Sequence, residues 1–520
     1  MIYLQVLRTL LAEIWSAEWF ATIADETRDL SGAEQFAISL RWVDTDYNVY
    51  EDLIGMVEVE STTAENLSST IKDTLLRSVL QLSQCRRQAY DGASNMAGSL
   101  SGVAKRLQLD EPAALFVHCL AHSLNLCLQD CGRQCSVVRE ALDLTSGLIT
   151  LIRASPKRLA IFKHLQEDLA PTAPGLKPLC PTRWTVRTGA LESILKNYVV
   201  IRAELEQISR ESCGEPSSNA SGYLALMERF ETFFGLQLSY LLFSATEQLS
   251  RILQMHDINA QDTTMAASQA VSFLFRQRSD AAFSEFYQTT VNKAKDLTEP
   301  PKLRRQRGIP RRLDDGSPNH TFSSPESFFC HQYFQIFDLL TNELKRRFNQ
   351  PSFEILKEIE SLLVKSCNGI TVQPSESFAA MYAKDLNLDR LRIQLCMLPD
   401  LLRTANEEHE LGVKKVTSIG TIVELFNTCS YSKTMLREVS RLLRIFLTVP
   451  MASATAEKSF SALRRLKNYL RTTMSQKRLN HLILLHTHKD RTDLLEISDI
   501  ARQFVSVNER RENYFGSWEV

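Results

Sequence analysis

The sequence predicts a mixed α/β domain at the start of the chain and a helix-rich remainder. Three observations support this. Strand and helix patterns alternate over roughly the first 130 residues, helical periodicity dominates from Val137 to Asn427, and the last segment is again strongly helical. With 520 residues and 44% hydrophobic content, the chain can build a large core and more than one domain.

The first elements are predicted to be three strands. An apolar run over residues 20–25 ends at Asp25, and residues 34–44 and 49–59 have the composition of the next two strands. The polar segment 44–48 between them fits a short turn. A turn this short would make the second and third strands antiparallel.

A helix, a strand, a helix and a further strand follow. The Ser/Thr run that ends at Thr63 is an N-cap signal for the first helix. Residues 86–91 form a short strand pattern that ends at an acid, residues 102–109 are helical, and residues 114–130 begin as a strand and continue as a helix. This order of elements is that of the ribonuclease H-like fold, which keeps metal ligands at the ends of its first and fourth strands.

The helical region contains two predicted loops, at residues 171–181 and 297–322. The second loop is rich in Pro, Gly and Arg, so we expect it to be exposed. The final helical segment, residues 431–488, has one break at Pro450.

Composition excludes several classes of protein. The net charge of −1 gives no overall sign of a nucleic-acid binder, so any basic surface must be local. The eleven Cys residues show no disulfide framework, the start of the chain lacks a secretory signal, and no uncharged run reaches the roughly 18 residues of a membrane span. These features favour a reducing compartment, the cytosol or the nucleus, and no association with membranes.

Three acids are candidate metal ligands: Asp25, Asp91 and Glu457. Two or three carboxylates can hold a pair of divalent ions about 3.5–4 Å apart for displacement at phosphorus. The acids are too far apart in sequence for periodicity to link them. By themselves, Asp25 and Asp91 could equally be turn or cap residues, and Glu457 an exposed helix residue paired one turn away.

Six motifs, in order, resemble those of the hAT transposase superfamily: ADETRD, EQFAISLRWVD, YDGASNMAG, HCLAHSLNL, PTRW and residues 452–485. The likeness is strongest to the branch of zinc finger MYM-type protein 1-like and TTF-type proteins. In that branch, a domain of unknown function (DUF4371-like) precedes a hAT C-terminal dimerisation region. The resemblance implies that residues 1–136 begin a ribonuclease H-like core, 137–430 form a large all-α insertion, and 431–505 dimerise and complete the core.

The same resemblance assigns roles to individual residues. It implies that Asp25, Asp91 and Glu457 form a DDE triad that binds Mg²⁺, and that Cys119 and His122 are a CxxH pair that supports the active centre. The alternative for this pair is a zinc site, although the later residues Cys127, Cys131 and Cys135 have the spacing of a buried helix stripe.

Predicted DNA contacts lie in two segments. The resemblance implies that Trp184, after Arg183, stacks on a flipped base; the alternative is a core anchor. A basic run could contact phosphates, be a solvated loop or act as a nuclear localisation signal. Its members are Lys302, Arg304, Arg305, Arg307, Arg311 and Arg312.

The chain departs from this family in two ways. Arg87 stands where relatives carry a Gly, so we expect its side chain either to hinder metal binding or to face solvent. No zinc-binding module precedes the first strand, which indicates a fragment, a truncated gene model or a form without its DNA-targeting module.

Two functions remain open at this stage. The first is a Mg²⁺-dependent DDE-type transposase that cleaves DNA and transfers strands. The alternative is a domesticated, catalytically silent nuclear regulator or scaffold that dimerises and associates with DNA. For both we expect a nuclear location and self-association through residues 431–488. The apolar residues of that segment have helical spacing, while its basic residues, Lys467 among them, are expected to stay in water.

Overall fold

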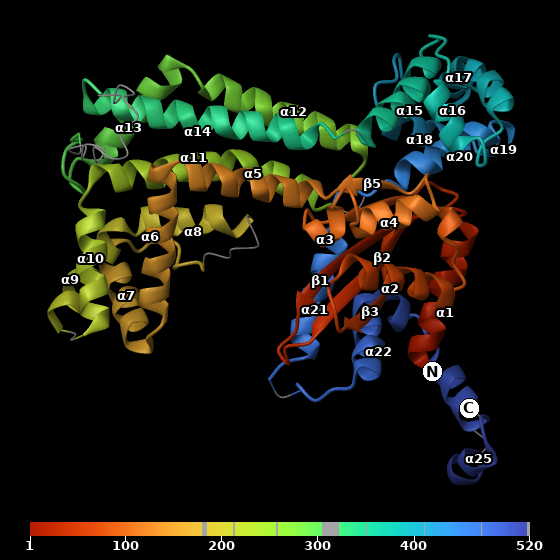
Figure 1. The fold of residues 1–520 in the computed structure, drawn as a ribbon, viewed down its shortest axis with the longest axis horizontal. Helices are drawn as coiled ribbons and strands as arrows, with labels where there is room; N and C mark the ends of the chain where they lie inside the picture. Colours follow the sequence, from red (N-terminus) through yellow and green to blue (C-terminus); the bar gives the residue numbers. More distant parts are fainter. Residues whose placement is uncertain are drawn as a thin grey trace. The chain divides into compact units, whose positions relative to one another are not determined.

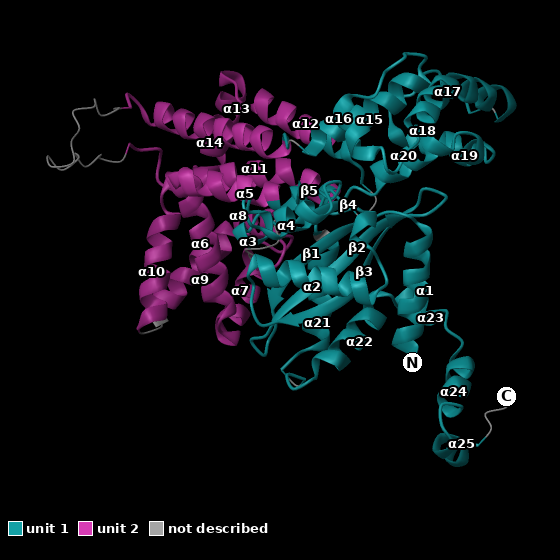
Figure 2. Cartoon of the chain, turned by 45° about the vertical axis from the view of Figure 1, so that its right-hand side comes forward, with its two compact units in different colours: residues 1–122, 253–264, 349–520 teal, residues 123–252, 265–348 magenta. Residues whose placement is uncertain are grey.

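The computed structural model describes residues 1–178, 185–211, 214–255, 258–303, 322–350, 352–409, 411–469 and 471–516. The chain forms two compact units (Figure 2). Unit 1 comprises Met1–His122, Leu253–Thr264 and Asn349–Val520, and unit 2 comprises Ser123–Ile252 and Met265–Phe348.

Unit 1 contains a five-stranded mixed sheet in the order β3-β2-β1-β4-β5 (Figure 1). Strand β2 is antiparallel to β1 and β3, whereas β4 is parallel to β1 and β5. The predicted order of the first strands and the antiparallel pairing of β2 with β3 are confirmed. The strands are β1 (Phe20–Arg28), β2 (Glu34–Val43), β3 (Val49–Val59), β4 (Cys85–Tyr90) and β5 (Leu115–His118).

Two local features differ from the prediction. Strand β1 does not end at Asp25, because Asp25 pairs with Ala37 and the ladder continues to the pair Arg28–Glu34. A helix that the sequence analysis did not assign, α1 (Ile2–Ser16), precedes the sheet. Its apolar residues recur at helical spacing and are buried, which is why this segment is a helix and not a free end.

Helices cover both faces of the sheet. On one face, buried residues of α1, α2 (Ala64–Arg77) and α4 (Val103–Asp110) share a core with the strands. On the other face lie α21 (Ala454–Leu466) and α22 (Gln476–Thr487), whose residues Ala456, Leu463, Leu479 and Ile483 share a core with Ile23 of β1. The end of the chain therefore returns to the first strands within unit 1.

Further helices of unit 1 come from residues 349–447, so the compact units do not follow the predicted boundaries at 136/137 and 430/431. Residues 349–430 join unit 1 because they are bonded to the sheet; for example, Asp385 is ion-paired with Arg86 of β4. These helices are α15 (Ser352–Cys367), α16 (Glu376–Tyr382), α17 (Leu388–His409), α18 (Ile419–Thr428), α19 (Ser432–Met435) and α20 (Arg437–Leu447). Short elements complete the unit: η1 (Leu82–Gln84), α3 (Ser94–Ala97), α23 (Lys489–Asp493), α24 (Ile497–Val505) and α25 (Glu509–Phe515).

Every element described in unit 2 is a helix. An aromatic cluster forms much of its core, with the rings of Phe234 and Phe329 4.6 Å apart. Its helices, some of whose ends belong to unit 1, are α5 (Leu120–Gln134), α6 (Ser136–Arg153), α7 (Pro156–Leu169), α8 (Thr185–Lys196), α9 (Tyr198–Glu211), α10 (Glu215–Met227), α11 (Phe230–Leu253), α12 (Ala260–Gln277), α13 (Asp280–Ala294) and α14 (Pro325–Phe348). Among the described residues, none of the helices has the length and apolar character to cross a membrane.

Candidate active site

The three predicted acids interact electrostatically in unit 1. Burial raises the pKa of Asp25 well above its usual value, and the negative charges of Asp91 and Glu457 raise it further. A hydrogen bond from the Glu26 amide to the Asp25 carboxylate opposes this rise only in part. Because charge repulsion weakens with distance, these effects place the carboxylates of Asp91 and Glu457 in the neighbourhood of Asp25.

Strand geometry explains why Asp25 meets Glu457. Side chains alternate between the two faces of a strand, so Asp25 lies on the same face as Ile23. Ile23 packs against Ala456 and Leu463 of α21, the helix that carries Glu457. The face of the sheet covered by the C-terminal helices is therefore the face on which Asp25 lies.

Asp91 is held in a tight turn directly after β4. Its carboxylate accepts a hydrogen bond from the Ala93 amide at 3.1 Å. The next residue, Gly92, packs against an imidazole, because a Cβ atom added there would lie 2.7 Å from Nε2 of His118. His122 is also close, with Cδ2 3.7 Å from the same point.

Cys119 connects three elements around this site. Its amide donates to the Tyr90 carbonyl at 3.1 Å, and its Sγ atom accepts from the amides of His122 and Ser453 at 3.4 and 3.2 Å. Burial, with a contribution from the charge of Glu457, raises the pKa of the thiol to about 11. Cys119 thus remains a neutral thiol that joins the end of β4 to the start of α21.

A buried ion pair fixes the other end of α21. Lys467 Nζ lies 2.5 Å from Asp29 Oδ2, and both side chains are almost completely buried. Burial alone would raise the pKa of Asp29, but hydrogen bonds from Lys467 and Ser31 lower it to about 2. The expectation that Lys467 stays in water is therefore wrong, since its charge neutralises a carboxylate inside the fold.

A second polar contact, near the start of α21, was also not predicted from the sequence. Thr455 donates a hydrogen bond to Glu51 of β3, and Glu51 pairs with the buried Arg41 of β2 at 2.8 Å. Arg41 in turn donates to the Leu447 carbonyl at the end of α20. These bonds attach the segment before Glu457 to the sheet, and no local sequence pattern reveals them.

Glu26 and Asn95 are further polar residues close to the acids. Asn95 Nδ2 donates to Glu26 Oε1 at 3.1 Å and to the Thr62 carbonyl at 2.9 Å. Burial raises the pKa of Glu26, and the charge of Asp91 adds to the rise. Only their sequence positions could have predicted a place near the site: Glu26 follows Asp25, and Asn95 lies in the motif that contains Asp91.

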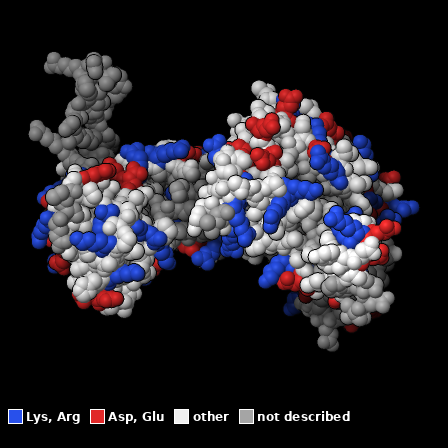
Figure 3. Space-filling view, turned by 90° about the horizontal axis from the view of Figure 1, so that it is seen from below, with Lys and Arg blue, Asp and Glu red and all other residues white. Residues whose placement is uncertain are grey.

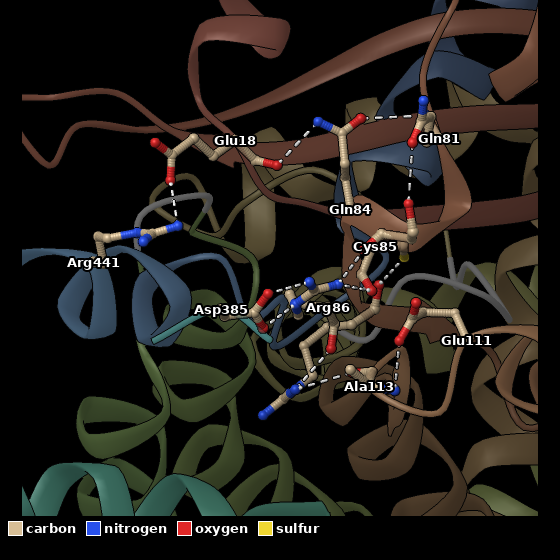
Figure 4. A network of polar contacts seen from close by, with 11 residues as sticks. Glu18, Gln81, Gln84, Cys85, Arg86, Glu111, Ala113, Asp385 and Arg441 are labelled. Atoms are coloured by element: carbon tan, nitrogen blue, oxygen red, sulfur yellow. Dashed lines mark hydrogen bonds and ion pairs between the residues drawn. The ribbon is translucent and has the colours of Figure 1, made fainter. Parts of the chain in front are cut away.

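Arg87 does not face solvent, contrary to one of the two expectations for it. The side chain is fully buried, and its guanidinium donates to the Tyr382 hydroxyl at 2.7 Å and to the Arg86 carbonyl at 2.7 Å. The neighbouring Arg86 forms the ion pair with Asp385 shown in Figure 4. This pair of arginines attaches α16 and the segment after it to β4.

Donor chemistry at the three acids suits Mg²⁺, which prefers carboxylate oxygens. The repulsion felt by Asp25 is also the kind of strain that a bound cation relieves. Among the described residues, no three His, Cys, Asp or Glu side chains already surround one point closely enough to hold an ion.

Two of the cysteines after Cys119, Cys127 and Cys131, lie one turn apart on α5, and Cys135 directly follows that helix. Cys127, Cys131 and Cys135 are all buried, and burial raises the pKa of each thiol. This arrangement agrees with the helix-stripe interpretation of their spacing.

Most predicted DNA contacts lie outside the described residues: Arg183, Trp184, Arg304, Arg305 and Arg307. Lys302 is described, and it is exposed and paired with Glu299 at 2.9 Å. Lys and Arg side chains lie interspersed with Asp and Glu on the face drawn in Figure 3. This mixture agrees with the near-zero net charge of the chain.

Two family models match the ends of the chain. Residues 2–102 match the ZMYM1/FAM200 RNase-like domain, DUF4371, and residues 426–490 match the hAT family C-terminal dimerisation region. The first match covers α1 and the strands that carry Asp25 and precede Asp91, and the second covers the helix that carries Glu457. The chain thus joins an RNase-like domain to a dimerisation region. Both matches agree with the resemblance to hAT transposase-derived proteins that its motifs predict.

The chain is also similar to two curated proteins, both named 52 kDa repressor of the inhibitor of the protein kinase. The mouse protein is 24% identical over 499 residues and the human protein is 24% identical over 498 residues. Each alignment covers 92% of this chain and 63% of the relative. The chain therefore spans less than two thirds of the length of these relatives.

Proposed function

We propose that this hAT-derived protein retains a divalent-ion site of the DDE type, formed by Asp25, Asp91 and Glu457 in a ribonuclease H-like core that the helical region interrupts. The observation that carries the proposal is the raised pKa of Asp25, whose causes include the charges of both other acids. A structural role alone gives no reason to keep two further acids close enough to repel the charge of Asp25, and groups with shifted pKa values cluster at functional sites.

The proposed reaction is Mg²⁺-dependent cleavage and transfer of phosphodiester bonds in DNA. Two bound Mg²⁺ ions would activate the attacking hydroxyl and stabilise the leaving oxygen. The residues of this chain would supply the ligands and fix their places. Asp25 is held by the sheet, Asp91 by its turn, and Glu457 by a helix that Lys467 and Cys119 attach at its two ends.

Replacing Asp25 with Asn tests this site without requiring a DNA substrate. In metal-free buffer at neutral pH, Asp25→Asn should stabilise the fold by roughly 0.5–2 kcal/mol, because it removes a repelled, partly buried charge. The folded-state pKa of Asp25 is raised, so its ionisation costs stability as the pH rises above about 4. The gain should therefore vanish in acid. Thermal unfolding at several pH values measures it.

Mn²⁺ should raise the melting temperature of the wild-type chain but not that of Asp25→Asn. The exposed Asp168→Asn is the matched control, since it removes a carboxylate far along the sequence from the acids. Equal responses of wild type and Asp25→Asn to Mn²⁺ would reject the site. Ion binding with no cleavage of supercoiled DNA would favour the silent regulator over the transposase.

The second candidate function is a domesticated, dimeric nuclear regulator or scaffold that associates with DNA. It is favoured by the names of the two relatives, which describe repressors, and by the dimerisation region at residues 426–490. The two functions share the expectation of self-association. They differ in whether the acids act on DNA.

Helix α22 allows the interface to be tested apart from the core. Leu479 and Ile483 are fully buried against the sheet, whereas Leu482 and Leu485 are only partly buried. Changing both Leu482 and Leu485 to Asp should leave unit 1 folded and shift the protein from dimer to monomer. Ile483→Asp should instead unfold unit 1, because it places a charge in the core.

Light scattering at micromolar concentration measures the mass, and tryptophan fluorescence reports the fold through the buried residues Trp19 and Trp42. A monomeric wild type would contradict self-association. Unfolding of the Leu482/Leu485 variant would show that these residues serve the core of one chain.

A further inference from the structure

Strand β5 forms one edge of the sheet. On its outer side, the backbone of His118 forms hydrogen bonds with the side chain of Gln350. The His118 amide donates to Gln350 Oε1 at 2.9 Å, and Gln350 Nε2 donates to the His118 carbonyl at 3.0 Å. One amide side chain thus satisfies both outward-facing backbone groups of His118, as the backbone of a neighbouring strand would. The backbone of His118 is therefore fixed from outside the sheet.

Fixing the His118 backbone also limits where the imidazole ring of His118 can lie. The ring lies between two others, with centroids 5.9 Å from Phe116 and 6.4 Å from His122. It occupies the space that a Cβ atom of residue 92 would need, with Nε2 at 2.7 Å and Cε1 at 2.8 Å from that position. Such distances exclude any side chain at residue 92 unless the ring moves.

The requirement for glycine at residue 92 is steric. Its backbone does not lie in the left-handed region that favours glycine, so conformation does not explain the choice. The ring of His118 closes one side of the turn from Asp91 to Ala93. The Cys119 amide in turn bonds to the Tyr90 carbonyl, directly before Asp91 in the sequence. Consecutive residues of the β5–α5 junction therefore bracket Asp91.

We propose that Gln350 and His118 are positioning residues for the Asp91 carboxylate. Gln350 fixes the His118 backbone, and the imidazole of His118 fixes the turn that presents Asp91 to divalent ions. The inference rests on the proposed function, because the ion site is the one formed by Asp91 with Asp25 and Glu457. It adds two residues that touch none of the ions but set where one ligand lies.

Mn²⁺ affinity of the full chain, measured by calorimetry, tests this arrangement. Gly92→Ala should weaken Mn²⁺ binding about tenfold or more, in line with the loss seen when groups that orient metal ligands are removed. Adding His118→Ala to Gly92→Ala should restore part of the affinity and of the thermal stability, because the space for the new methyl group is then free. If Gly92→Ala simply disrupted the fold, adding His118→Ala would restore neither the Mn²⁺ affinity nor the thermal stability.

Gln350 is tested by two substitutions and a control. Gln350→Ala should weaken Mn²⁺ binding, and Gln350→Glu should weaken it less, since a carboxylate can still accept from the His118 amide but cannot donate to its carbonyl. The exposed Gln503→Ala should bind as wild type. Wild-type affinity in Gly92→Ala and Gln350→Ala would overturn the positioning role while leaving the proposed function intact. Absence of Mn²⁺ binding by the wild type would overturn both.

Discussion

Replacing Lys467 with Met should destabilise unit 1 by about 3–5 kcal/mol, one of the two largest losses that we expect from a single substitution. The substitution leaves the Asp29 carboxylate buried without its cation, and the side chain of Asp29 is only 1% exposed. Urea unfolding followed by the fluorescence of Trp19 and Trp42 measures the loss. Lys458→Met, an exposed change on the same helix, should alter stability by less than about 0.5 kcal/mol.

The same ion pair predicts a dependence on pH. Because the pKa of Asp29 falls to about 2 in the folded protein, the ionised carboxylate stabilises the fold above its usual pKa of about 4. This stabilisation should be lost as the pH falls from about 4 toward 2. In Lys467→Met the loss should be smaller, because the pKa of Asp29 in the folded protein is then lowered less. If the wild type and Lys467→Met lost the same amount of stability over this pH range, Lys467 would not be the cause of the low pKa of Asp29.

The strands were predictable because their signals are local. Alternating or continuous apolar runs and the polar turn at residues 44–48 gave the order and approximate limits of β1, β2 and β3. The length of β1 was not predictable from its own residues. Its last residues, Asp25 to Arg28, stay in the sheet because β2 pairs with them across the turn. That pairing depends on both strands, so the sequence of β1 alone does not predict it.

The candidate site was predictable only in its acids, and only because their motifs resemble those of a family. The contacts that fix the acids join distant residues of ordinary type. Asp29 accepts hydrogen bonds from Ser31 in the turn that follows it. Its stronger partner, Lys467, lies at the opposite end of the chain. Likewise, Gly92 looks like a turn glycine, and only packing against His118 shows why no larger residue fits.

The role of Arg87 could not be predicted from its difference from the family pattern. A charged residue in place of Gly on the strand before Asp91 suggested interference with metal or exposure to solvent. In the structure its guanidinium bonds to Tyr382, and Arg86 beside it bonds to Asp385. The two arginines therefore serve the attachment of a helical segment to the sheet, which sequence patterns in either segment do not indicate.

Asp385→Ala should cost unit 1 about 3–5 kcal/mol, comparable to the loss in Lys467→Met. Arg86 contacts Asp385 through two bonds, Nε to Oδ2 at 2.7 Å and Nη2 to Oδ1 at 2.5 Å (Figure 4). Both side chains are less than 10% exposed, so the substitution leaves a buried guanidinium without its carboxylate. The backbone carbonyls of Ser83 and Cys85 still accept from Arg86, but they cannot neutralise its charge.

A double replacement separates the cost of the unpaired charge from the value of the pair itself. Arg86→Met combined with Asp385→Leu should recover much of the stability lost in Asp385→Ala, because neither partner then buries a lone charge. Asp110→Ala, which breaks an exposed pair with Lys72, is the control and should change stability by at most about 1 kcal/mol. A loss in Asp385→Ala no larger than in this control would mean that water reaches Arg86, and that the attachment of α16 to β4 contributes little to the fold that positions Asp91.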